Sequence, residues 1–387
     1  MKNTALFCLG LLLMFGAMLA AQTPGPCIGG ISNAAFVNWP QFHSDVCHTG
    51  YNASEFILSP ANVGNLVLDW KYNTGIEVDL ASPTVANGVV YISDEIKGVS
   101  ALNASTGAKL WSFPTAGDGE SAPAVANGMV YFGGGNNLYA LNATTGAPLW
   151  IASFPGYTFY SPMVANGVVY IGSEDHNIYA LNASNGNQLW HYTTGNLLVS
   201  SPAVANGVVY VSSYDKSIYA LNASTGAKLW SFATGGELAS SPAVANGVVY
   251  VGSRDHNVYA LNATTGAKLW SFETSYFEVN STPAIANGMV YVGSNDGYVY
   301  ALDAATGAKL WGSNIGESVE SSPAVANGVV YLGAYDFKVH ALSASTGDEL
   351  WSFTTGTTVR SSPAVANGVV YIGSGDGYLY AFHLLGQ

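Results

Sequence analysis

The sequence is poor in charge, in arginine and in cysteine. Charged side chains make up 9% of the 387 residues, and 11 basic residues stand against 24 acidic ones, which gives a net charge of −13. A chain without a basic stripe has no electrostatic attraction for phosphate backbones, so nucleic acid is not expected as a partner. Beyond the first 21 residues no apolar run approaches a membrane span, and the mature chain is expected to lack a transmembrane segment.

The N-terminus carries the only long apolar stretch. Residues 1–21 contain Lys2, an apolar run and the small residues Ala20 and Ala21, which is typical of a secretory signal peptide. A retained membrane anchor is the alternative, although the run is short for a span. The sequence therefore predicts an exported protein, either periplasmic or extracellular.

Only three cysteines occur in the chain. Cys8 falls in the predicted leader, and an oxidising compartment favours a disulfide between the remaining two, Cys27 and Cys47. The alternative is a metal site formed by His43, Cys47 and His48, which has no supporting ligand spacing. Residues 22–64 are otherwise rich in Gly, Asn, Ser and Pro and are expected to form an irregular lead-in.

The rest of the chain is a repeat of about 40 residues. Asn-Gly pairs flanked by alternating Val, Tyr and Ile predict tight hairpins, because a type I′ turn needs positive φ at both central positions. Each copy, such as residues 200–235, reads as four short antiparallel strands. The Asn-Gly pairs begin at eight positions: Asn87, Asn127, Asn166, Asn206, Asn246, Asn287, Asn327 and Asn367.

Repeated four-stranded meanders of this length are typical of β-propeller blades. The stretch 65–72 reads as a fourth strand with no strands before it, and the last copy stops after its third strand. Pairing the two would complete an eighth blade and remove two open sheet edges. The prediction is an all-β, closed eight-bladed propeller over residues 65–387, sealed by its N-terminal strand and monomeric.

The fourth strand of every copy contains a tryptophan, which we expect to pack between blades. In the turn before it the chain reads ALNASTGAKLW, and once ALDAATGAKLW, around Asp303. This resembles the tryptophan-docking repeat of PQQ-like propellers, and closest in type are the BamB-like members that bind proteins without catalysis. The eight tryptophans are Trp70, Trp111, Trp150, Trp190, Trp230, Trp270, Trp311 and Trp351.

The resemblance also implies an alternative, a PQQ-dependent alcohol or sugar dehydrogenase. In those enzymes PQQ stacks between a tryptophan and a disulfide of adjacent cysteines, beside Ca²⁺ held by acidic and amide ligands. This chain has no adjacent cysteines, and no cysteine in its repeats. The family's catalytic residues therefore find no counterpart, and we expect no catalytic residue, no bound metal and no cofactor.

Variation between copies is confined mainly to the loops on one face of the ring. The Ala-Asn-Gly turns are constant, whereas the loops that join one copy to the next read, for example, TGGELASS and TSYFEVNST. A folding role repeats in every blade but a binding role need not. The candidate binding residues are Glu120, Tyr157, Phe159, Tyr160, Arg254, Tyr276, Phe277, Glu320 and Arg360.

Aromatic rings and an occasional arginine on an acidic rim suit a protein or peptide partner, or stacking on a glycan. A solvated rim with internal ion pairs is the alternative interpretation. The sequence thus predicts an exported, non-enzymatic binding scaffold.

Overall fold

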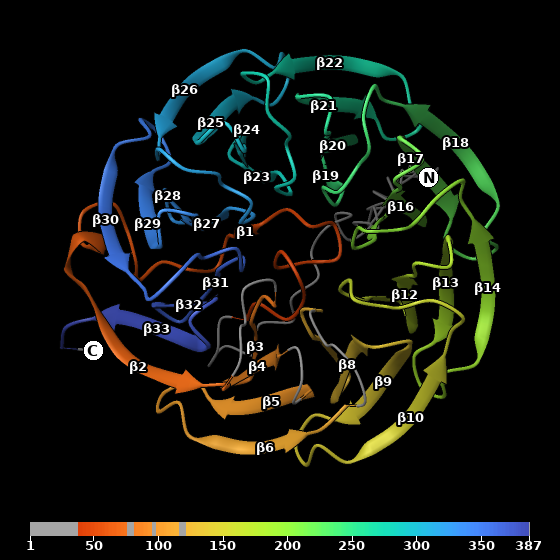
Figure 1. Cartoon of the computed structure of the whole chain (residues 1–387), viewed down its shortest axis with the longest axis horizontal. Coiled ribbons are helices and arrows are strands. Elements are labelled where there is room, and N and C mark those ends of the chain that lie inside the picture. The colour runs from red at the N-terminus through yellow and green to blue at the C-terminus, as the bar shows by residue number, and fades with distance from the viewer. Residues whose placement is uncertain (1–37, 76–80, 95–97, 116–120, 387) are drawn as a thin grey trace, which may run out of the picture.

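The structure is a computed structural model that describes residues 38–75, 81–94, 98–115 and 121–386. The predicted leader, Cys27 and Glu120 lie outside these residues. Eight antiparallel sheets of four blade strands each surround a central axis (Figure 1), and one sheet gains a short fifth strand from the lead-in. The predicted all-β eight-bladed propeller is confirmed.

Each blade runs from an inner strand at the axis to an outer strand at the rim. The inner strands are β3 (Thr84–Ala86), β7 (Ala124–Ala126), β11 (Met163–Ala165), β15 (Ala203–Ala205), β19 (Ala243–Ala245), β23 (Ala284–Ala286), β27 (Ala324–Ala326) and β31 (Ala364–Ala366). The second strands are β4 (Val89–Asp94), β8 (Met129–Gly134), β12 (Val168–Gly172), β16 (Val208–Ser212), β20 (Val248–Gly252), β24 (Met289–Gly293), β28 (Val329–Gly333) and β32 (Val369–Ser374).

The third strands are β5 (Gly98–Asn103), β9 (Asn137–Asn142), β13 (Asn177–Asn182), β17 (Ser217–Asn222), β21 (Asn257–Asn262), β25 (Tyr298–Asp303), β29 (Lys338–Ser343) and β33 (Tyr378–Leu384). The outer strands are β6 (Lys109–Phe113), β10 (Pro148–Ser153), β14 (Gln188–Thr193), β18 (Lys228–Ala233), β22 (Lys268–Glu273), β26 (Lys309–Asn314), β30 (Glu349–Thr354) and β2 (Leu66–Asn73).

The Asn-Gly turns have the expected geometry. In the fourth blade Ala203 pairs with Tyr210, and the turn between them has φ of 50° at Asn206 and 75° at Gly207. Positive φ at both residues matches the twist of the flanking strands, which is why Asn-Gly recurs there. The second and third strands are buried or half-buried throughout, as β16 and β17 illustrate, so they form the packing surfaces between blades.

The ring closes as the sequence predicts. The outer strand of the last blade is β2, which pairs antiparallel with β33 from Leu66 opposite Leu384 to Asn73 opposite Tyr378. Figure 1 shows β2 in orange beside the blue β33. Joining the first and last parts of the propeller in one sheet gives each of the eight blades four strands.

The outer-strand tryptophans connect each blade to the next. Each indole Nε1 donates to a backbone carbonyl of the following blade; Trp230, for example, donates to Ala263 O at 2.9 Å. The indole ring also lies against a turn glycine with positive φ, such as Gly266, where a Cβ would come within 2.7 Å of the ring. The other seven bonds run from Trp70, Trp111, Trp150, Trp190, Trp270, Trp311 and Trp351.

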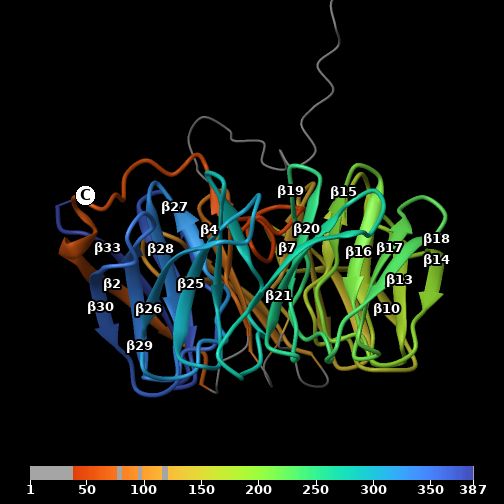
Figure 2. The same ribbon diagram turned by 90° about the horizontal axis from the view of Figure 1, so that it is seen from above.

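The described part of the lead-in, residues 38–64, holds β1 (Tyr51–Asn52) and most of a 3-10 turn, η1 (Val63–Asn65), which ends at the first residue of the propeller. It lies at the centre of the ring in Figure 1 and along the upper face in Figure 2. It forms hydrogen bonds of 2.6–2.8 Å with the middle residue of all eight inner strands. Two of these bonds use side chains of the lead-in: Gln41 Oε1 accepts from Val164 N, and the Asn52 amide donates to Val365 O. In the other six a backbone oxygen of the lead-in accepts from an inner-strand N–H, in the pairs Trp39 with Val85, Pro40 with Val125, Val46 with Val204, Cys47 with Val244, Thr49 with Ile285 and Gly50 with Val325.

These contacts give the irregular lead-in a definite role in the fold. Inner-strand N–H groups that face the axis have no further strand to pair with, and buried N–H groups need an acceptor. The lead-in supplies an acceptor to seven of the eight inner strands, donates through Asn52 to the eighth, and fills one end of the axial channel.

Candidate functional site

A cavity of about 270 Å³ occupies the other end of the axis, on the face with the variable loops. This volume is slightly below the range for small-molecule pockets, about 300 to 1,000 Å³. Its lining comes from the loops that enter the inner strands and from two loops between second and third strands, with Phe42 contributed by the lead-in. The lead-in and the blade loops together therefore enclose one site.

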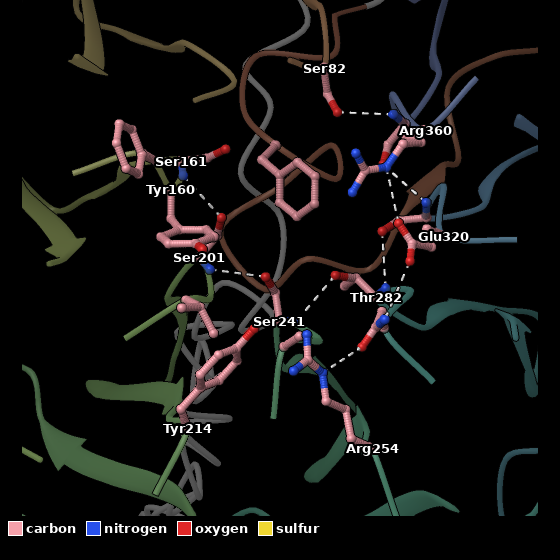
Figure 3. A pocket seen from close by; sticks show the side chains of 17 residues that line it. Ser82, Tyr160, Ser161, Ser201, Tyr214, Ser241, Arg254, Thr282, Glu320 and Arg360 are labelled. Atoms are coloured by element: carbon pink, nitrogen blue, oxygen red, sulfur yellow. Dashed lines mark hydrogen bonds and ion pairs between the residues drawn. The ribbon is translucent and has the colours of Figure 1, made fainter. Parts of the chain in front are cut away.

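A ring of hydroxyl groups surrounds this cavity (Figure 3). The backbone N–H of one blade donates to the hydroxyl oxygen of the next; Ser201 N, for example, lies 2.9 Å from Ser241 Oγ. The chain of bonds is broken at Ala122, which has no hydroxyl. Each hydroxyl accepts one N–H and keeps its own O–H as a donor. The seven groups belong to Ser82, Ser161, Ser201, Ser241, Thr282, Ser322 and Ser362.

One repeat position diversifies the wall of the cavity. It lies two residues before each ring hydroxyl, and all six of its described side chains line the cavity: Phe159, Val199, Ala239, Asn280, Glu320 and Arg360. Three consecutive blades thus present apolar groups, and the next three present polar ones. The cavity therefore has an apolar arc, Phe159 with Val199 and Ala239, and a polar arc, Asn280 with Glu320 and Arg360.

Arg254 lies between two glutamates on the rim. Its guanidinium is 2.8 Å from Glu237 and 3.3 Å from Glu278, and it stacks 4.8 Å from the ring centre of Tyr214. Partial burial acts to lower the pKa of Arg254, but Tyr214, Glu278 and Glu237 outweigh it and raise the pKa. Arg254 is therefore a fixed cation at this site.

Arg360 and Glu320 form the second charged pair, with Arg360 Nε 3.0 Å from Glu320 Oε2. Glu320 also accepts from Tyr335 at 2.9 Å and from Asn280 at 3.5 Å. Asn280 in turn contacts Arg254 at 3.4 Å, so one network joins both arginines. The internal ion pairs of the alternative interpretation are thus present.

The candidate residues divide into two groups. Phe159, Tyr160, Arg254, Glu320 and Arg360 line the cavity. The others described lie outside it: Tyr157 stacks on Phe159 with ring centres 4.9 Å apart, while Tyr276 and Phe277 protrude and are 83% and 55% exposed.

Sequence reasoning missed Phe42 and the hydroxyl ring. The ring was visible only as a Ser-Ser-Pro or Ser-Thr-Pro before five of the eight inner strands, with Ala-Ser-Pro, Ser-Ala-Pro and Tyr-Ser-Pro before the other three, and a folding role also explains this pattern. The position two residues before each ring hydroxyl was the signal that could have located the cavity, because its residue differs in every described blade while the residue after it is serine in five of these six blades.

Among the titratable groups that the lead-in buries, His43, Asp45 and His48 have shifted pKa values. Burial lowers the pKa of His43 to about 4 and that of His48 to about 3, where the neighbouring His43 contributes. Burial raises the pKa of Asp45 to about 6, although Thr49 and backbone N–H groups donate to it. His43 Nδ1 and Nε2 lie 2.8 and 2.9 Å from the carbonyls of His48 and Pro323, and the protonated nitrogen donates.

The metal site weighed for the lead-in has no support in the part of the chain that the structure describes, where no three His, Cys, Asp or Glu side chains are grouped to hold an ion. Cys47 is disulfide-bonded. Its predicted pairing with Cys27 stays a prediction, since Cys27 is outside the described residues. Within the same ranges no helix is long and apolar enough to cross a membrane.

Comparison with known proteins assigns the family. The sequence model described as outer membrane protein assembly factor BamB matches residues 64–151, 97–200, 193–297 and 295–385, which together cover well over half of the chain. The chain belongs to this family. The predicted relation to PQQ-like, BamB-like propellers is therefore confirmed.

Solved structures agree with the fold. BamB from Moraxella catarrhalis has 19% sequence identity and a TM-score of 0.72, covering 82% of this chain and 99% of that one. Quinohemoprotein alcohol dehydrogenase from Comamonas testosteroni has 18% identity and a TM-score of 0.80, covering 91% and 81%. At these identities the likeness shows the fold alone.

A curated quinohemoprotein alcohol dehydrogenase from Comamonas testosteroni is also similar locally, with 34% identity over 80 residues, or 20% of this chain. The match spans only 11% of the dehydrogenase. A PQQ site of the kind described above needs a tryptophan, adjacent cysteines and a group of metal ligands. The described lining of the cavity contains neither tryptophan nor cysteine. The residues present therefore do not fit that site.

Proposed function

We propose that the protein is an exported, monomeric and non-enzymatic scaffold that binds a protein or peptide partner through its variable face. Export rests on the leader-like residues 1–21, and places the protein in the periplasm or outside the cell. The observation that carries the proposal is the exposure of Tyr276, Phe277 and Tyr157 on this face. Exposed aromatic rings are typical anchors of protein interfaces.

The two charged residues and the aromatics have different roles in this proposal. Arg254 and Arg360 are engaged by glutamates, so they give the rim a fixed charge pattern that aligns a partner. Tyr276 is held at φ of 59°, a left-handed conformation that is uncommon for a non-glycine residue. Such a conformation at an exposed aromatic favours a functional role over a packing role.

The assay for a partner compares the wild type with two variants, one on the outer strand β22 and one in the exposed loop that follows this strand. The purified protein is immobilised and incubated with a bacterial envelope extract, and captured proteins are quantified by mass spectrometry. We expect at least one protein to be captured by the wild type and by Leu269→Ala, and to be lost with Tyr276→Ala/Phe277→Ala. Leu269 is a matched control because it is 51% exposed but lies on the outer strand β22.

Absence of any protein whose capture depends on Tyr276 and Phe277 would contradict the proposal. The enzymatic alternative is checked separately, by incubating the protein with PQQ and Ca²⁺, desalting it, and measuring quinone absorbance and dye-linked alcohol oxidation. We expect neither retained quinone nor turnover. Retention with turnover would replace the scaffold proposal by an oxidoreductase.

A further inference from the structure

The axial cavity suits a smaller ligand than the protein partner proposed for the exposed aromatic side chains. It is enclosed by loops on its sides and by Phe42, so it admits a small molecule or a single side chain. Its hydroxyl ring presents O–H donors from seven of the eight blades, with a gap at Ala122, which favours a ligand with several acceptor oxygens. This inference does not depend on the proposed protein partner.

The charges around the cavity argue against an anionic ligand. The cluster contains two arginines, Arg254 and Arg360, and three glutamates that pair with them, Glu237, Glu278 and Glu320, so its net charge is 2 − 3 = −1. A cation would find carboxylates already engaged by arginine, and would offer the hydroxyl ring no acceptor. A neutral ligand is not repelled by the net negative charge, and one that both donates and accepts hydrogen bonds can also pair with the O–H groups of the ring.

The two arcs of the wall specify the shape of that ligand. Phe159, Val199 and Ala239 form an apolar arc, and Asn280, Glu320 and Arg360 form a polar arc on the following blades. Tyr157, outside the cavity, stacks on the ring of Phe159 with ring centres 4.9 Å apart and so holds that ring in place. A molecule with one apolar face and a polar edge would match both arcs, because the ring covers C–H groups while the amide and carboxylate bind hydroxyls.

We propose that the axial cavity binds a neutral pyranose sugar. One ring face of the sugar packs on Phe159, and its hydroxyl groups donate to Glu320 and Asn280 and accept from the serine ring. The guanidinium of Arg360 donates to the sugar edge while Glu320 holds it in place. The arrangement binds the sugar without altering it.

The experiment measures binding of D-glucose, D-galactose and D-glucuronate by saturation-transfer NMR and calorimetry. For a ligand of this size we expect a Kd of about 1 mM for the better neutral sugar. Glucuronate should bind more weakly than glucose, because the cluster already carries net negative charge. Tighter binding of glucuronate than of both neutral sugars would contradict the neutral-ligand inference.

Three variants locate the site. Phe159→Ala should weaken sugar binding about tenfold, and Ala239→Trp, which fills the cavity, should abolish it. Phe277→Ala is the matched control, an exposed aromatic of the same face outside the cavity, and should leave the Kd unchanged. Thermal unfolding of each variant verifies that it is folded.

No saturation transfer to any of the three sugars, or transfer that survives Ala239→Trp, would overturn the proposal. The partner assay is independent of it. Phe277→Ala disturbs only the proposed protein interface, and Ala239→Trp disturbs only the sugar site, so the two proposals fail separately.

Discussion

The two faces of this propeller are built from the same strands but carry different kinds of sequence. On one face the Asn-Gly and Thr-Gly turns repeat almost unchanged, and each Thr-Gly turn receives the tryptophan of the preceding blade. On the other face the loops differ between blades and surround the cavity. Residues that make the same contact in every blade are thus constant, whereas loop residues that could contact a single ligand or partner vary from blade to blade.

The largest effect should come from the constant face. Trp270 is 8% exposed and its indole donates to Ala304 O at 3.0 Å. Replacing a buried tryptophan by alanine costs about 3 to 5 kcal/mol, since it removes packing and leaves a cavity. Trp270→Ala should lower the free energy of unfolding by that amount in urea titrations, while Tyr276→Ala on the variable face should change it by less than about 0.5 kcal/mol. Equal losses would remove the distinction between the faces.

The second prediction concerns the loss of stability in acid that comes from titratable groups buried in the lead-in. Between pH 6 and 4 the unfolded chain protonates His43 and His48, whereas the folded chain protonates only Asp45, because their folded pKa values are about 4, 3 and 6. On unfolding, these three groups together take up about one net proton, so their contribution to stability should fall by about 1.4 kcal/mol per pH unit as the pH drops. Urea unfolding at pH 6, 5 and 4 measures this slope.

His48→Leu is the matched variant for that slope. It removes one of the two histidines, so proton uptake by the remaining His43 and release from Asp45 should cancel. The contribution of the lead-in to the slope between pH 6 and 4 should then vanish. An unchanged slope would show that these three groups do not control the acid response.

A third comparison uses two glycines with positive φ, one on each face. Gly266 has φ of 71° and a Cβ there would lie 2.7 Å from Trp230, whereas Gly316 has φ of 95° with no atom within 4 Å. Both alanine variants carry the backbone strain, but only Gly266→Ala also displaces an indole. Its unfolding free energy should fall by about 1 to 3 kcal/mol more than that of Gly316→Ala. Similar unfolding free energies for the two variants would mean that Trp230 can shift to accommodate the added methyl group without loss of stability.

The smallest effect on stability is expected at the charged rim. Arg360 and Glu320 are partly exposed, and ion pairs in such positions contribute about 0.2 to 1 kcal/mol. Arg360→Ala combined with Tyr160→Ala should therefore weaken capture of a partner while lowering unfolding free energy only slightly. A large loss of stability would show that these residues belong to the core of the ring.

Much of the fold could be predicted because local chemistry repeats eight times. Asn-Gly fixed each hairpin through positive φ, and the unpaired strand at residues 65–72 implied closure with the C-terminal strand. The path of the lead-in could not be predicted, because it is held by backbone carbonyls on Val N–H groups, and such contacts leave no side-chain pattern.

The candidate site was predicted in part. The variable loops pointed to Arg254, Glu320 and Arg360, since single charged residues stand out in a repeat. Which candidate residues line the cavity and which lie outside it depends on which loop residues point to the axis. The serines of the hydroxyl ring mark those residues, but this can be recognised only from the folded structure. Phe42 lies more than 100 positions before the other aromatics of the cavity, so only the folded lead-in brings it there.

The claim that one face binds and the other holds the blades together can be tested directly by site-specific photo-cross-linking. A benzophenone side chain is placed at Tyr276, or at Thr264 in the constant turn of the same blade, and the protein is irradiated in envelope extract. The account predicts a discrete adduct from position 276 and none from position 264. Adducts of equal yield from both positions, or an adduct from position 264 alone, would contradict it.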